Sequence, residues 1–121
     1  MLNSSYLSAN SIDYEATLER FCGREDHFEK YLLEFKKNYS LKKLEKAIQN
    51  EDIGSAFFSA HDLKGTSGNL GMTNLYKSSC KLTELLRNIQ HPDMVRIKST
   101  FTELQNDYKK IIEVLEKGIT Q

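Results

Sequence analysis

One histidine lies among glycines in the segment 60–71, which reads AHDLKGTSGNLG and falls in a region of helical periodicity. On a helical wheel at about 100° per residue, Gly54, Gly65 and Gly68 all fall within about 40° of His61. The opposite face carries mostly small residues: Ala56, Ser59, Ala60, Leu63, Thr66, Ser67 and Leu70. We therefore predict that His61 points away from the core, on a helix surface with few side chains around it.

The three glycines around His61 need a physical explanation. A glycine in a helix interior costs about 1 kcal/mol relative to alanine. Glycines can serve close helix packing, but packing glycines belong on the core face, and the wheel places these on the other face. The alternative is that a second macromolecule approaches the histidine and needs the room that a bare backbone leaves.

Two aromatic residues, Phe57 and Phe58, flank the same face, one on each side of the histidine. Large apolar side chains on an exposed face are typical of a docking surface. Either ring could instead fold into the edge of the bundle, and the sequence does not decide between these positions. The docking hypothesis predicts a patch made of Phe57, Phe58, Gly54 and Gly68.

An exposed histidine can act as a nucleophile, because imidazole has a reference pKa of about 6.5 and is largely neutral at cellular pH. Lys64, three residues on, is a neighbour on the helix surface, where its charge disfavours imidazolium and attracts a phosphoryl group. We find no glycine-rich phosphate loop and no acidic cluster for Mg²⁺. The sequence therefore predicts a phosphoryl acceptor without an ATP site; the plainer interpretation is a solvated surface histidine.

The remaining histidines and the cysteines offer little chemistry. His27 and His91 lie at a helix start and in a turn, and no two histidines have the four-residue spacing of a helical metal site. Cys22 and His27 lack further ligands for zinc, so no metal site and no cofactor are predicted. The two cysteines, Cys22 and Cys80, fit reduced thiols.

Helical periodicity runs through most of the chain, which has one proline, Pro92. We predict a short helix over about 12–23, then one bent helix or two abutting helices over 25–49, and three further helices that begin near residues 52, 72 and 93. Apolar residues at helical spacing mark three of these regions. They are Phe28, Leu32, Phe35 and Tyr39 in the region 25–49; Leu75, Leu82, Leu86 and Ile89 in the helix that begins near residue 72; and Ile97, Phe101, Leu104, Tyr108, Ile111 and Leu115 in the helix that begins near residue 93. Short connections between long amphipathic helices predict an all-α, antiparallel four-helix bundle with a short additional N-terminal helix. Residues 1–11 are expected to be a flexible tail, and residues 12–119 the domain.

Composition excludes several classes of protein. Lys and Arg together number 17, as do Asp and Glu, so no electrostatic footprint for nucleic acid or an anionic membrane is present. No apolar run approaches the roughly 18 residues of a membrane span. The start of the chain has neither the basic nor the apolar region of a signal peptide, so we expect a cytoplasmic protein, acting as a monomer.

The segment from His61 to Gly68, HDLKGTSG, followed by Gly71, resembles the signature of histidine-containing phosphotransfer (HPt) domains. The resemblance covers about residues 12–117 and includes the segment IDYEATLERFCGREDHFEKYLLEF. It implies a four-helix bundle in which His61 takes a phosphoryl group from one receiver aspartate and passes it reversibly to another. Lys64 would assist electrostatically and Gly65 would give access. The implied partners are response-regulator receiver domains, which would supply Mg²⁺, and an upstream hybrid histidine kinase.

The resemblance also implies a polar side chain on the adjacent helix that holds the inner imidazole nitrogen. In a hairpin that turns near Gly71, the residues level with His61 are Lys81, Thr83 and Glu84, and none is favoured over the others. Two other functions compete with the phosphorelay carrier. One is a helical module that docks receivers or other signalling partners without being phosphorylated, and the other is a small metal-binding bundle or enzyme.

Overall fold

The computed structural model describes residues 1–38, 40–88 and 90–119, and in these ranges the regular structure is entirely helical. It contains seven helices, in the order α1 (Ser4–Ala9), α2 (Tyr14–Arg20), α3 (Glu25–Phe35), α4 (Ser40–Gln49), α5 (Ile53–Asn69), α6 (Thr73–Leu85) and α7 (Met94–Gly118). The predicted all-α class is therefore confirmed. Of the residues used in the predicted stripes, Tyr39 and Ile89 lie outside the described ranges.

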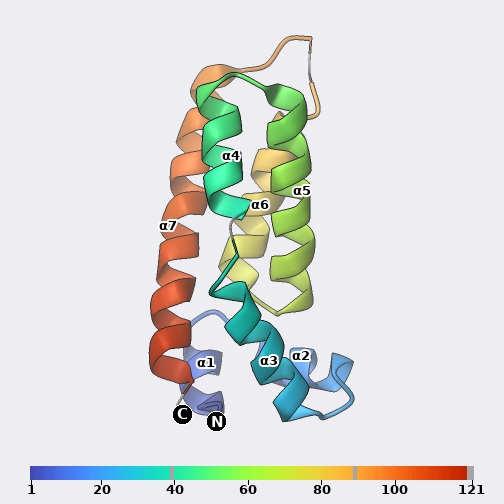
Figure 1. Cartoon of the computed structure of the whole chain (residues 1–121), viewed down its shortest axis with the longest axis vertical. Helices are drawn as coiled ribbons and strands as arrows, with labels where there is room; N and C mark the ends of the chain where they lie inside the picture. Colours follow the sequence, from blue (N-terminus) through green and yellow to red (C-terminus); the bar gives the residue numbers. More distant parts are fainter. Residues whose placement is uncertain (39, 89, 120–121) are drawn as a thin grey trace.

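Four helices, α4 to α7, lie side by side in alternating directions (Figure 1). Helix α3 precedes α4 along the same side of the molecule and lies toward the end where both termini are found. Helix α5 packs between α4 and α6, and α7 closes the bundle against α6 and α4. The core includes these large, fully buried apolar side chains: Phe28, Phe35, Leu7, Ile12, Leu32, Leu44, Leu63, Met72, Leu75, Leu82, Leu86 and Ile97. This core fixes the position of α5, the helix that carries the histidine segment.

The region 25–49 forms two helices, which is one of the two arrangements that the sequence left open. α3 ends at Phe35 and α4 begins at Ser40, where the Asn38 side chain accepts a hydrogen bond from the Ser40 N–H at 2.6 Å. The Tyr108 hydroxyl of α7 donates to the Asn38 carbonyl at 3.0 Å. The break is thus stabilised by partners for backbone groups that a continuous helix would have satisfied itself.

The prediction of a flexible tail over residues 1–11 is wrong for most of that segment. Asn3 caps α1, its backbone N–H donates to the Gly118 carbonyl at 2.8 Å, and Leu7 is fully buried. Leu7 packs closely on Gly118 at the end of α7, where a side chain on residue 118 would collide with it. The structure therefore has two short N-terminal helices, α1 and α2, where the sequence predicted one.

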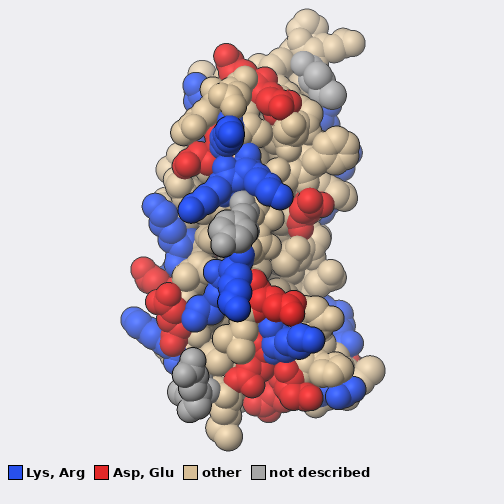
Figure 2. Space-filling view, viewed as in Figure 1, with Lys and Arg blue, Asp and Glu red and all other residues tan. Residues whose placement is uncertain are grey.

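Charges of both signs share the surface. On the face shown in Figure 2, basic side chains gather over α4 and acidic ones over the α3 end of the molecule. Within the described residues, no helix is both long and apolar enough to cross a membrane.

Candidate functional site

Helix α5 presents the histidine segment and has well-defined ends. The Asp52 carboxylate caps its first turn by accepting a hydrogen bond from the Ser55 N–H at 3.2 Å. At the other end, Gly71 has φ +70°, and a Cβ there would meet the Asp13 carbonyl at 3.0 Å and the Thr17 hydroxyl closer still. Only glycine fits this turn, because both the backbone conformation and the neighbouring α2 exclude a side chain.

The structure places His61 on the exposed side of α5. Four of the positions that the wheel assigned to the core side are buried in α5, namely Ala56, Ala60, Leu63 and Ser67, and Ile53 at the start of the helix is buried as well. The small side chains of Ala56, Ala60 and Ser67 let α5 lie close to both α4 and α6. The imidazole is consequently reachable from solvent, on a helix whose opposite side packs against α4 and α6.

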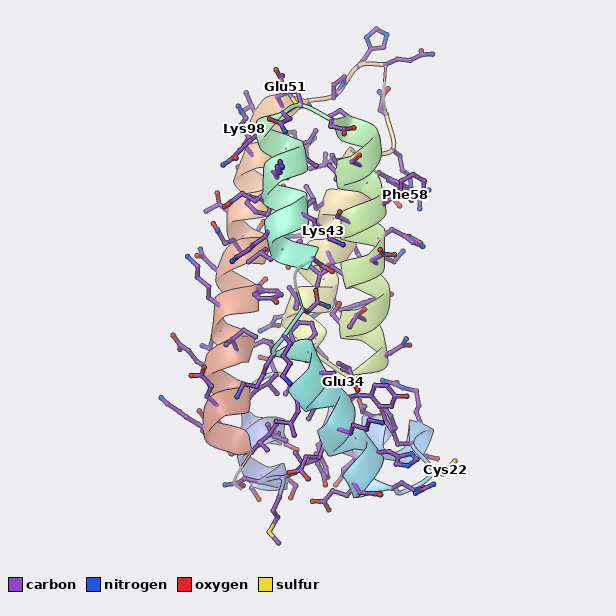
Figure 3. All side chains as sticks on the ribbon, in the orientation of Figure 1. Cys22, Glu34, Lys43, Glu51, Phe58 and Lys98 are labelled. Carbon is purple, nitrogen blue, oxygen red and sulfur yellow. The ribbon has the colours of Figure 1, made fainter. Side chains whose placement is uncertain are left out.

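Phe57 and Phe58 adopt different positions, which the sequence could not assign. Phe58 is 68% exposed and projects from the outer edge of α5 (Figure 3). Phe57 is half-buried, and its ring lies edge-on to that of Phe58, with centroids 5.9 Å apart. The Phe57 ring also stacks with the His61 imidazole, at 6.0 Å between centroids and 17° between planes. The exposed apolar ring of Phe58 suits contact with a partner.

The glycines of α5 are not equivalent. A Cβ on Gly65 would meet nothing within 4 Å, and one on Gly54 would meet only an Asp52 oxygen, at 3.9 Å. A Cβ on Gly68 would lie 3.0 Å from the ring of Tyr76 on α6. The interpretation of Gly68 as an open position is therefore wrong: it is a packing glycine. Gly54 and Gly65 do lie on bare helix surface.

Lys64 is half-buried on α5, one turn from His61. None of the salt bridges formed within the described residues includes its ammonium group. The charge is therefore not neutralised by a carboxylate and remains available to an anion that reaches His61.

Each of the three candidates for holding the imidazole is bound to another residue. The Lys81 ammonium lies 3.5 Å from Glu103 of α7, and the buried Thr83 hydroxyl donates to the Ser79 carbonyl at 2.7 Å. The Glu84 carboxylate accepts a hydrogen bond from Arg87 Nε at 2.8 Å. No hydrogen bond connects any of the three to His61 among the described residues.

Arg87 belongs to the site and was missed by the sequence analysis. Its guanidinium carbon lies 5.4 Å from the centroid of the Phe57 ring. The same hairpin counting that was applied to His61 would have placed residue 87 level with Phe57. Together with Gly54, Phe58 and Leu86, these two residues line a groove of about 320 Å³.

No group of three or more His, Cys, Asp or Glu side chains that could hold a metal ion occurs in the part of the chain that the structure describes. Both cysteines are free thiols; Cys22 is exposed and Cys80 is half-buried.

The family model of the Hpt domain matches residues 31–114 of the chain. The chain belongs to the Hpt domain family. The match covers the end of α3, the whole of α4, α5 and α6, and most of α7, so residues 12–30 and 115–117, where the sequence also resembled the family, lie outside it. No curated protein and no solved structure matches the chain. Hpt domains are phosphotransfer carriers rather than kinases, and they interact with receiver domains and kinases in two-component systems.

Proposed function

We propose that this Hpt domain carries a phosphoryl group on His61, which it accepts from a receiver aspartate and passes reversibly to another. The observation that carries the proposal is the exposed imidazole beside Gly65, where a Cβ would meet nothing within 4 Å. The buried side of α5 packs into the four-helix core, and the exposed helix surface around His61 carries few side chains. This combination suits attack on a group that is bound to another protein.

In the proposed transfer, the lone pair of one imidazole nitrogen attacks the phosphorus of the aspartyl phosphate. An N–P bond forms as the bond from phosphorus to the acyl oxygen breaks, and the aspartate leaves as a carboxylate. The proton on the other ring nitrogen stays there, so the product is a phosphorylated imidazolium. The reverse transfer to a second receiver follows the same course in the opposite direction.

Stabilisation of the transferred phosphoryl group would come partly from a residue near His61 and partly from the receiver. The unpaired ammonium of Lys64 would attract the phosphoryl oxygens as negative charge collects beside the imidazole. Mg²⁺ and the other groups that stabilise the transition state would come from the receiver, since this chain is expected to need no cofactor. An upstream hybrid histidine kinase would phosphorylate the first receiver. We place the protein in the cytoplasm, as a monomer, with no role in binding nucleic acid or membranes.

The partner would dock on the acceptor face, which we define as Gly54, Phe57, Phe58, His61 and Gly65. Phe58 offers the largest exposed apolar area of this face, and the groove beside it would take an apolar side chain of the receiver. Gly68 is not part of this face, because the Tyr76 ring lies against it. The same features would also support the second candidate, a docking module that is never phosphorylated.

The two candidates differ in one covalent bond. Incubation with a phosphorylated receiver, followed by intact-mass measurement under conditions that preserve phosphohistidine, should show a gain of one phosphoryl group. A complex that forms without any gain in mass would favour the docking module. Metal analysis of the purified protein tests the third possibility, a metal-binding bundle.

A further inference from the structure

The His61 imidazole has an aromatic neighbour but no hydrogen-bond partner among the described residues. The contact that the structure gives it is the Phe57 ring, four residues earlier on α5, at 6.0 Å and 17°. Offset stacking at this separation lies within the range that aromatic pairs prefer. The direction of the imidazole therefore depends on where the Phe57 ring stands.

The Phe57 ring is itself contacted by a side chain from the turn that follows α6. The Arg87 guanidinium lies 5.4 Å from the ring centroid, inside the roughly 6 Å limit of a cation–π contact. Arg87 Nε in turn donates to Glu84 at 2.8 Å, one turn earlier on α6. Contacts thus run without interruption from Glu84 through Arg87 and Phe57 to the imidazole, and they join α6 to α5 at the level of the acceptor face.

These contacts do not contribute much to the stability of the fold. The side chains of Arg87 and Glu84 are 52% and 66% exposed, and exposed ion pairs stabilise proteins little. A contact that is too weak to stabilise the fold can still hold one aromatic ring in place. A catalytic group gains from neighbours that hold its rotamer, because a misdirected nucleophile must first reorient.

We propose that Arg87 is a positioning residue, which holds the Phe57 ring so that the imidazole of His61 stacks against it and keeps a nitrogen turned toward the partner. Arg87 acts through Phe57 and does not touch the phosphoryl group. The benefit to transfer rests on the proposed function of His61. The packing itself exists in the free protein and can be measured there.

The experiment compares four variants with the wild type: Arg87→Ala, Arg87→Lys, Phe57→Leu and the control Lys81→Ala. The control removes the other salt bridge of α6, between side chains that are 63% and 58% exposed, but on the side that faces α7. The first measurement is the NMR chemical shift of the His61 ring protons in the free protein, because the ring current of Phe57 displaces them. The second is the rate of phosphotransfer from a saturating phosphorylated receiver.

We expect Phe57→Leu to abolish the ring-current displacement and Arg87→Ala to remove a large part of it. Arg87→Lys keeps a cation over the ring but loses the planar contact with Glu84, so its effect should be intermediate. Transfer should slow by about two- to fivefold in Arg87→Ala, the ratio that corresponds to a weak cation–π contact. Lys81→Ala should change neither measurement.

Unchanged His61 shifts in Arg87→Ala would overturn the proposal. A slower transfer with unchanged shifts and weaker receiver binding would overturn it as well, since Arg87 would then be a docking residue. If no variant and no wild-type protein accepts a phosphoryl group, the proposed function fails, yet the chemical shifts still report whether Arg87 orders the two rings.

Discussion

Replacing Gly65 should make the protein more stable and a poorer phosphoryl acceptor. Gly65 lies inside α5, and a Cβ there would meet nothing within 4 Å, so no steric penalty opposes the gain in helix propensity. Gly65→Ala should stabilise the fold by about 1 kcal/mol. For a domain of 121 residues, this corresponds to a rise of about 4 °C in the midpoint of thermal unfolding. Circular dichroism on heating measures it directly.

The effect on transfer should have the opposite sign and grow with the size of the side chain. Gly65→Gln adds a long side chain one turn from His61, in the space that the receiver would occupy. We expect its transfer rate to fall at least about tenfold, equivalent to about 1.4 kcal/mol, and Gly65→Ala to fall less. A matched substitution at an exposed position of α7, Thr102→Gln, should leave the rate unchanged. A normal rate in Gly65→Gln would refute the access role of Gly65.

Three further predictions concern other residues of α5 and its N-cap. Lys64→Ala should slow transfer by about tenfold while receiver affinity, measured by calorimetry, stays constant; lost affinity at an unchanged rate would make Lys64 a docking residue. Gly68→Ala should stabilise the fold less than Gly65→Ala, because the new Cβ would lie 3.0 Å from the Tyr76 ring, and equal thermal midpoints would contradict this. Hydrogen bonds from the Ser55 side chain and, second, from its backbone N–H lower the pKa of Asp52 in the folded protein. The ionised cap therefore stabilises the fold at pH values above the unfolded pKa of about 3.9, and this contribution is lost as pH falls through the lower folded pKa. Urea unfolding should therefore find wild type more stable than Asp52→Asn at pH 7, with a difference that shrinks below pH 4; a constant difference would argue against the charge.

The long amphipathic helices could be predicted from the sequence because each buries one regular stripe of apolar residues. The stripe from Ile97 to Leu115 became α7, and all of its members are buried. The short helix α1 could not be found in this way. It has six residues, too few for a periodic signal, and its stability depends on the burial of Leu7 against the end of α7.

The wheel placed His61 on the exposed side of α5 but could not show which side chains of other helices cover the same face. Gly68 looked open because Tyr76, which lies against it, comes from α6. Arg87 was missed for a related reason. Register predicts which residues are level, whereas the direction of a long side chain depends on its partners, here Glu84 and the Phe57 ring.

The central claim is that His61 is the phosphorylated residue, and the three histidines of the chain allow a direct test. Each is replaced in turn, as His61→Gln, His27→Gln and His91→Gln, and intact mass is measured after incubation with a phosphorylated receiver. Helical circular dichroism should be preserved in all three, since each side chain is exposed. We predict that His27→Gln and His91→Gln gain one phosphoryl group as the wild type does and that His61→Gln gains none. Normal phosphorylation of His61→Gln would contradict the account.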